Sequence, residues 1–147
     1  ALTIGTLDGA NIEIREQVGA ENIFIFGLQA HEVTSLKARG YAPETFVASN
    51  PDLARTLDMI DSGHFSPANV FDGKPIVGRL LSDGEPFLVL ADFAAYARAQ
   101  DEVDALYLQP DEWSRKAVLN ALGMGTFSSD RSIREYAERI WRIKPVL

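Results

Sequence analysis

The sequence predicts an α/β fold with a parallel sheet, and the first 40 residues support this most clearly. In them, short apolar runs alternate with helical patterns in the order strand, helix, strand, helix, which is typical of parallel α/β sheets. Ile23–Phe26 is an unbroken apolar run, as expected for a strand that is covered on both faces. With 147 residues, of which 46% are hydrophobic, the chain is long enough for one globular domain.

The first strand is expected at Leu2–Ile4, and Gly5–Gly9 is expected to form the turn that follows it. Asp8 is a candidate N-cap, because its carboxylate can accept hydrogen bonds from the free N–H groups of a first helical turn. The next helix should end at Gly19. Its apolar positions recur at helical spacing, at Ala10, Ile14 and Val18.

The second strand, Ile23–Phe26, should end at Gly27, and a helix carrying Val33 and Leu36 should end at Gly40. After Gly40 the patterns are mostly helical. Asn50 followed by Pro51 indicates a helix start, because a capping residue precedes a proline at the first helical position. This helix should place Leu53, Leu57 and Ile60 on one face and end at Gly63.

A short helix is expected over Ile76–Leu81, closed by Ser82–Gly84, after a loose segment at His64–Lys74. Pro86–Ala91 has the pattern of a third strand. Asp92 is then expected to cap a helix that reaches Tyr107.

The next helix should begin at Pro110 and end at Gly123. The last helix has a single apolar stripe at i, i+3, i+4, i+7 and i+8, formed by Ile133, Tyr136, Ala137, Ile140 and Trp141. Ser128, Ser129 or Ser132 could cap it, and Ser132 with Glu135 has capping-box spacing. Pro145 should prevent its extension.

Three strands are few for such a sheet, because sheets average about 5–6 strands. The first strand also has no preceding segment with which to pair, and the chain begins with an apolar run and no Met. The pattern therefore predicts an α/β domain whose first half lies outside these 147 residues.

Composition excludes several functions. The net charge is −7 and the pI about 4.8, which argues against a nucleic-acid surface. The sequence has no cysteine and so no disulfide, thiolate metal site or thiol nucleophile. Since no apolar run approaches about 20 residues and no leader is present, we expect no membrane partner and a cytoplasmic location.

Chemical motifs are weak. GTLDG, at Gly5–Gly9, lies between a strand and a helix, where phosphate loops occur, but it matches no phosphate-loop pattern. A strand-to-helix turn with an acidic cap is the favoured interpretation. The alternative is that Thr6, Asp8 and Asn11 lie at the carboxyl edge of the sheet, where α/β proteins bind ligands.

The other candidate groups favour structural interpretations. His31 and His64 are the only histidines, and metal binding needs three or four convergent ligands. No G-x-S-x-G nucleophile elbow occurs. The carboxylates of Asp101, Glu102 and Asp104 have the spacing of a solvated helix face rather than of a catalytic pair.

The roles of two aromatic residues and of a basic cluster remain open. Trp113 and Trp141 could stack on sugars, but both lie on apolar helical stripes, which favours core packing. The C-terminus is basic in an acidic chain, either because cations suit a helix C-terminus or because it docks on an acidic domain. Its cations are Arg131, Arg134, Arg139, Arg142 and Lys144.

The chain resembles the glycogen/starch (α-glucan) phosphorylases over essentially its whole length. TLDGAN-x-E is followed by EN-x-FIFG, at Thr6–Glu13 and Glu21–Gly27, and FSSDR precedes YA-x-x-IW, at Phe127–Arg131 and Tyr136–Trp141. Ser62–Pro67, SGHFSP, is a further shared stretch. In combination these motifs are specific.

The resemblance implies a GT-B glycosyltransferase with two facing Rossmann-like domains. Such enzymes cleave the terminal α-1,4 bond of glucan with phosphate to give glucose 1-phosphate, and they use pyridoxal 5′-phosphate held by a lysine in a Gly-x-Gly-Asn-x-Lys stretch. That stretch would precede Ala1. Residues 1–147 would form the C-terminal part of the C-terminal, cofactor-side domain, without the N-terminal domain and the first half of its own domain.

No lysine of this chain has the context of the cofactor lysine; the four lysines are Lys37, Lys74, Lys116 and Lys144. No catalytic, cofactor-binding or metal residue is therefore assigned. At best, Thr6, Asp8 and Asn11 would support the residues that touch ligands without touching ligands themselves. The chain alone is expected to be inactive, to bind no cofactor and to self-associate through exposed apolar surface. Its partner would be the rest of the phosphorylase, which binds glucan and phosphate and is expected to be a homodimer.

Two other interpretations stay open. The first is a naturally short, non-catalytic α/β interaction module derived from a phosphorylase tail, for which a starting Met and a protected first strand are expected. The second is a GT-B enzyme with a nucleotide-sugar donor, such as a glycogen synthase, which the pairing of TLDGAN with ENIFIFG disfavours.

Overall fold

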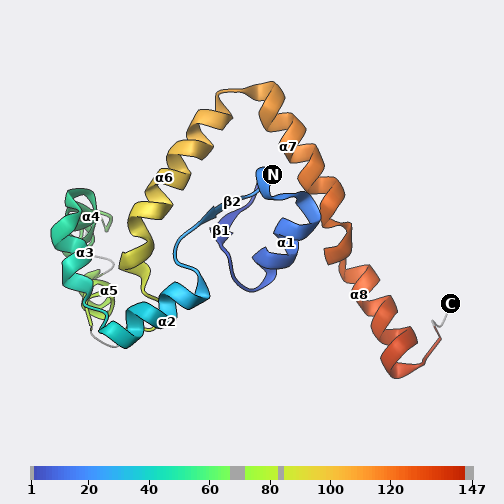
Figure 1. The fold of residues 1–147 in the computed structure, drawn as a ribbon, viewed down its shortest axis with the longest axis horizontal. Coiled ribbons are helices and arrows are strands. Elements are labelled where there is room, and N and C mark those ends of the chain that lie inside the picture. The colour runs from blue at the N-terminus through green and yellow to red at the C-terminus, as the bar shows by residue number, and fades with distance from the viewer. Residues whose placement is uncertain (1, 67–71, 83–84, 145–147) are drawn as a thin grey trace. The chain divides into compact units, whose positions relative to one another are not determined.

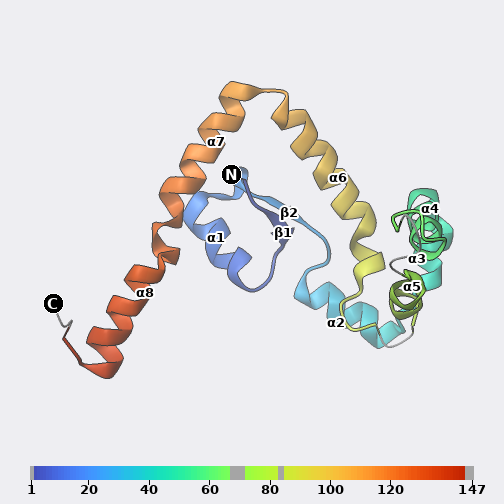
Figure 2. The same cartoon turned by 180° about the vertical axis from the view of Figure 1, so that it is seen from behind.

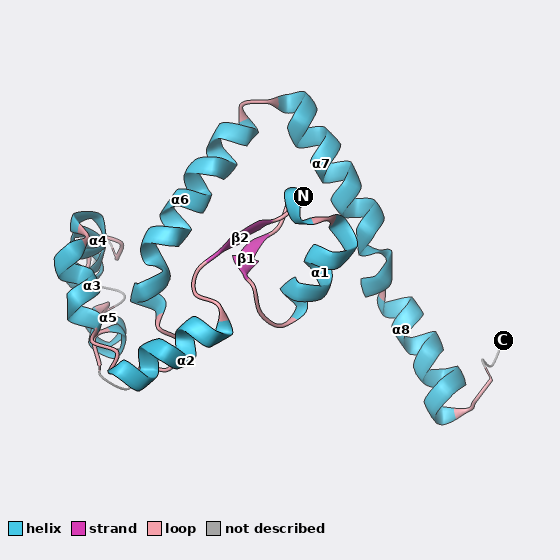
Figure 3. Cartoon of the chain, viewed as in Figure 1, coloured by secondary structure: helices cyan, strands magenta, loops and turns pink. Residues whose placement is uncertain are grey.

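The computed structural model describes residues 2–66, 72–82 and 85–144 (Figure 1). Predictions that involve Pro67, Asp83, Gly84 or Pro145 lie outside the described residues, as does the middle, 67–71, of the segment expected to be loose. The described part is a mostly helical α/β chain (Figure 3).

The elements follow one another along the chain as β1 (Ile4–Thr6), α1 (Ala10–Val18), the 3₁₀ turn η1 (Ala20–Asn22), β2 (Phe24–Phe26), α2 (Ala30–Arg39), α3 (Pro43–Ser49), α4 (Pro51–Asp61), α5 (Lys74–Leu80), α6 (Val89–Tyr107), α7 (Pro110–Gly123), the 3₁₀ turn η3 (Met124–Phe127), α8 (Ser129–Glu135) and the π-helical η4 (Tyr136–Trp141).

The described residues form two compact units. Residues 2–5, 9–24 and 103–144 belong to the first unit, and residues 6–8, 25–66, 72–82 and 85–102 belong to the second.

The strands β1 and β2 pair in parallel, so the predicted strand, helix, strand order is confirmed. The backbone amide of Phe24 donates to the carbonyl of Thr3 at 2.9 Å. β1 begins later than predicted, and Gly5 and Thr6, which were expected in the turn, belong to the strand.

The predicted helix after β1 is confirmed as α1, but Asp8 is not its N-cap. Gly9 is the N-cap residue, and no side chain caps this end. The carboxylate of Asp8 instead accepts a hydrogen bond from the hydroxyl of Thr6 at 3.0 Å. The predicted stop at Gly19 is confirmed, because its amide donates to the carbonyl of Arg15.

Within the first unit, α1 packs against α7 (Figures 1 and 2). A Cβ atom at Gly123 would lie 2.9 Å from Cγ1 of Val18 and 3.1 Å from the carbonyl oxygen of Gln17. The end of α7 thus approaches α1 so closely that only glycine fits there without a shift. Gly123 also serves as the last residue of α7, as predicted.

Within the second unit, α4 and α5 pack together over an apolar core. Its buried members are Leu53, Leu57, Val77 and Leu90, with Phe46, Val47, Ile60, Leu80, Leu81 and Phe93 packed around them. The start predicted at Asn50 is confirmed, because its side-chain oxygen accepts from the amide of Leu53 at 3.0 Å.

The helix α3 was not expected from the sequence. This helix begins with Pro43 after Ala42, and no side chain caps it, so it lacks the polar start signal that marks α4. Pro43 is fully buried.

The third strand predicted at Pro86–Ala91 is wrong, because the chain turns there and α6 begins at Val89. The buried carboxylate of Glu85 accepts hydrogen bonds from the amides of Phe87 at 2.7 Å and Val89 at 3.0 Å. Leu88 adopts a left-handed conformation with φ of 55°. These contacts form a helix start, which a purely apolar pattern does not distinguish from a buried strand.

Asp92 is consequently not the N-cap of this helix; it lies within the first turn of α6. The helix that it was expected to open does reach Tyr107, as predicted.

At the C-terminal end, Ser128 is the N-cap of α8, because its hydroxyl oxygen accepts from the amide of Arg131. The capping box of Ser132 with Glu135 is wrong, since the hydroxyl of Ser132 donates to the carbonyl of Ser128. Most of the apolar stripe of this last helical segment is exposed, and Trp141 is 53% exposed, so core packing of Trp141 is also wrong for the described residues.

Candidate functional site

A cavity of about 550 Å³ lies in the second unit, between the end of β2 and the first half of α6. We call it the aromatic cavity. It is lined by Thr6, Asp8, Phe26, Leu28, Val33, Phe87, Val89, Asp92, Phe93 and Tyr96. Its size is within the range of about 300–1,000 Å³ that is usual for small-ligand sites.

Gly27 and Asp92 build one side of the aromatic cavity. Gly27 ends β2 with φ of 81°, a conformation that side chains other than glycine rarely adopt. A Cβ atom at this position would also lie 2.8 Å from Cγ of Asp92. The backbone amide of Leu28 donates to Oδ1 of Asp92 at 2.7 Å, so the carboxylate holds the chain just after β2.

The carboxylate of Asp92 lies in a partly buried, acidic setting. Burial, and after it the nearby carboxylates of Glu32 and Asp8, raise the pKa of Asp92, while the hydrogen bond from Leu28 opposes the rise. Asp92 is half-buried and Asp8 is exposed. The negative charge of this wall is therefore unfavourable as it stands, and a cation would relieve it.

Aromatic rings form much of the remaining wall. Phe26 and Tyr96 meet edge to face with ring centroids 5.2 Å apart. Phe87 is 79% exposed, and Tyr96 is exposed as well. Exposed aromatic rings beside carboxylates suit a ligand with an apolar body and a positive charge.

The structure brings two of the three predicted ligand-edge residues together. Thr6 and Asp8 both line the aromatic cavity, at the carboxyl end of β1. Asn11 lies in the first unit, with its side chain against the backbone of Gly5. Asp92 and Tyr96, which come from α6, were not expected in the site; a lone carboxylate among apolar neighbours at Asp92 was the available signal.

A second cavity of about 450 Å³ lies along α2 and includes His31, Glu32, Ser35 and Arg39 among its lining residues. Within residues 2–66, 72–82 and 85–144, no group of three or more His, Cys, Asp or Glu side chains could hold a metal ion. In the same ranges, no helix is long and apolar enough to cross a membrane. Asp101, Glu102 and Asp104 are exposed, as predicted.

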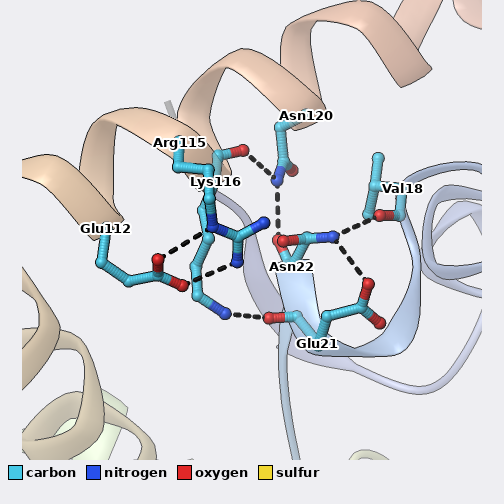
Figure 4. A network of polar contacts seen from close by, with 7 residues as sticks. All are labelled: Val18, Glu21, Asn22, Glu112, Arg115, Lys116 and Asn120. Carbon is cyan, nitrogen blue, oxygen red and sulfur yellow. Dashed lines mark hydrogen bonds and ion pairs between the residues drawn. The ribbon is translucent and has the colours of Figure 1, made fainter.

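A polar network holds η1 against α7 in the first unit (Figure 4). The amide nitrogen of the buried Asn120 donates to the carbonyl of Asn22 at 2.7 Å and to that of Lys116 at 3.0 Å. The side-chain nitrogen of Asn22 donates to the carbonyl of Val18 at 2.7 Å. The ammonium group of Lys116 donates to the carbonyl of Glu21. These side chains donate to backbone carbonyls, which is a structural role.

The chain belongs to the carbohydrate phosphorylase family, because the model of that family matches residues 1–143. It is 52% identical over 147 residues to a glycogen phosphorylase of Synechocystis sp. and 50% identical over 143 residues to one of Chlamydia trachomatis. It is also 46% identical over 145 residues to the brain form of human glycogen phosphorylase.

These matches cover 97–100% of the chain but 17% of each relative. The chain therefore spans about a sixth of the length of the curated relatives that it matches.

The phosphorylase family in general depends on pyridoxal phosphate. This cofactor needs a lysine amine for its aldehyde and N–H or cationic groups for its phosphate. The aromatic cavity offers carboxylates, and its described lining includes no lysine or arginine. The ammonium group of Lys37 donates to the carbonyl of Pro86 at 2.9 Å, and Lys37 is not among the lining residues. The residues of the cavity therefore do not fit the cofactor.

Proposed function

We propose that this chain is a segment of an α-1,4-glucan phosphorylase, which converts glycogen, starch or maltodextrin to glucose 1-phosphate. The observation that supports this most strongly is the 52% identity over the whole chain to a relative of which it covers 17%. The segment is the C-terminal part of the cofactor-side domain of a GT-B fold, and it has a structural role.

The chain by itself is inactive in this proposal. Phosphorolysis with pyridoxal phosphate needs a lysine in a phosphate-binding setting, and the cavity is instead walled by Asp8 and Asp92. The catalytic and cofactor-binding residues belong to the remainder of the phosphorylase. That remainder is the partner of this chain, in a cytoplasmic enzyme that binds glucan and phosphate and forms a homodimer.

A hybrid enzyme tests the proposal. The matching 147 residues of the Synechocystis phosphorylase are replaced by this chain, and formation of glucose 1-phosphate from glycogen and phosphate is measured. We expect activity within about tenfold of the parent enzyme, because each position of the chain has a counterpart there. The purified 147-residue chain, assayed beside it with added pyridoxal phosphate, should show none.

A folded hybrid without activity would contradict the assignment as a working segment. It would favour the alternative, a non-catalytic interaction module. Phosphorolysis by the isolated chain would contradict the structural role instead.

A further inference from the structure

We propose that the aromatic cavity is the receptor for a guanidinium or ammonium side chain with an apolar neighbour, supplied by the part of the phosphorylase outside these 147 residues. This inference rests on the proposed function, because it takes the occupant from the rest of that enzyme. Charge complementarity and the missing length of chain both support it.

The charge of the cavity is one-sided. Asp8 and Asp92 lie in its wall, and Glu32 lies close enough to act on Asp92 electrostatically. The three salt bridges formed by the described residues all lie on α7, α8 and η4, so none involves these carboxylates. A cation placed between Asp8 and Asp92 would offset their repulsion.

The aromatic wall completes the match to a cation on an apolar stem. The rings of Phe26 and Tyr96 are held edge to face, and Phe87 is largely exposed beside them. Positive groups are attracted to the faces of such rings by roughly 0.5–1 kcal/mol at exposed sites. Arginine and lysine side chains bury apolar stems while their charged ends pair with carboxylates.

The extent of the match to the relatives identifies the source of this side chain. The chain covers 17% of the length of the relatives it matches, so most of such an enzyme is available to fill the cavity. An exposed aromatic wall of this kind is typical of an interface. Asp8 and Asp92 would then be positioning residues that fix the register of the two parts.

The test uses n-butylguanidinium as a probe and the neutral n-butylurea, which has nearly the same shape, as its control. Each is titrated into the ¹⁵N-labelled chain, and amide shifts near Leu28 and Asp92 give the apparent Kd. We expect the guanidinium to bind at least about fivefold more tightly than the urea, with the difference shrinking at high salt.

Charge variants locate the effect. Asp8→Asn with Asp92→Asn keeps the shape of both side chains, and an Asn oxygen at position 92 can still accept from Leu28. This double variant should bring the guanidinium Kd to within about twofold of the urea value. Asp101→Asn, which removes an exposed carboxylate farther along α6, should leave the Kd unchanged.

Equal Kd values for the two probes would overturn the proposal. So would a guanidinium Kd that does not change in the Asp8→Asn, Asp92→Asn variant. Sedimentation tests whether a second copy of the chain fills the cavity instead. If the chain is a dimer that the guanidinium converts to a monomer, a second copy is the occupant, and the proposal is overturned. The hybrid enzyme assay uses no probe, so it tests the proposed function independently of the cavity. Failure of one proposal can therefore be told apart from failure of the other.

Discussion

Asp92 joins two parts of the second unit that are 64 positions apart in the chain. Its carboxylate accepts the amide of Leu28 at 2.7 Å and lies over Gly27, where a side chain would collide with it. The same carboxylate lines the aromatic cavity. One side chain therefore closes the end of β2 and sets the charge of the cavity.

The pKa of Asp92 predicts how stability depends on pH. Burial raises this pKa above that of the unfolded chain, so the folded state binds the proton more tightly. The stabilisation from this group is complete below the ordinary aspartate pKa of about 3.9. It is lost as the pH rises through the raised value.

Asp92→Asn removes this dependence while keeping the acceptor for Leu28. Relative to wild type, we expect its free energy of unfolding to increase as the pH rises from about 3.5 to 7. Urea unfolding at both pH values measures this, with Asp101→Asn as the control. A difference between Asp92→Asn and wild type that stays constant with pH would contradict the prediction.

Asn120 provides a second residue-scale prediction. It is 2% exposed and donates to the carbonyls of Asn22 and Lys116. Asn120→Ala leaves the Asn22 carbonyl buried without this donor and should lower the free energy of unfolding by about 1–3 kcal/mol. Urea unfolding measures the loss. Ser114→Ala, on the exposed face of α7, should stay within about 0.5 kcal/mol of wild type.

At the scale of elements, local signals decided which predictions succeeded. Asn50 with Pro51 marked the start of α4, because a cap and a proline act on their own neighbours. The start of α6 was misread, because Glu85 and Leu88 act through a buried carboxylate and an unusual backbone angle. Neither the buried carboxylate nor the backbone angle produces a periodic pattern in the sequence.

The site follows the same rule. Thr6 and Asp8 were placed at the carboxyl edge of the sheet, because a strand followed by a helix defines that edge. Asp92 and Tyr96 reach the cavity from α6, far along the chain. Periodicity within α6 contains no information about which earlier strand end it meets, so Asp92 and Tyr96 could be assigned to the cavity only from the tertiary structure.

The start of α6 depends on Leu88, whose side chain is 1% exposed although its φ is 55°. Leu88→Ala removes buried volume and should lower the free energy of unfolding by about 2–5 kcal/mol. Val89→Ala, at a largely exposed position one residue later, should cost less than about 1 kcal/mol. Thermal and urea unfolding of both variants check this, and similar losses would show that burial of Leu88 is not what stabilises this start.

The cap of α4 is tested by rescue. Asn50→Ala removes the acceptor for Leu53 and should lower the free energy of unfolding by about 0.5–2 kcal/mol. Asn50→Ser and Asn50→Asp, which restore a capping oxygen, should recover most of it. If neither recovers stability, the loss does not come from capping.

At the scale of the whole molecule, large apolar side chains remain exposed along α7, α8 and η4. Leu122 is 76% and Ile140 63% exposed. Arg131 and Arg139 each lie 3.5 Å from a carboxylate oxygen of Glu135, so part of the basic C-terminal cluster is paired within the helix. Whether the rest docks on an acidic domain stays a prediction.

These exposed side chains predict self-association of the isolated chain. Leu122→Lys with Ile140→Lys should lower the average mass measured by sedimentation at equal concentration, with little change in the free energy of unfolding. Ser114→Lys with Ala121→Lys adds the same charge at exposed positions of α7 without removing a large apolar group, and it should have a smaller effect. Equal effects of the two pairs would assign the change to charge alone.

The bond between Asn120 and the carbonyl of Asn22 also has a consequence for synthesis on the ribosome. The two residues are 98 positions apart, and at roughly 5–20 residues per second the later one follows after about 5–20 s. During that time η1 lacks the partner that covers it in the finished chain. The contact of η1 with α7 therefore forms only after the rest of this segment has been synthesised, so the N-terminal part of the chain waits for its later partner.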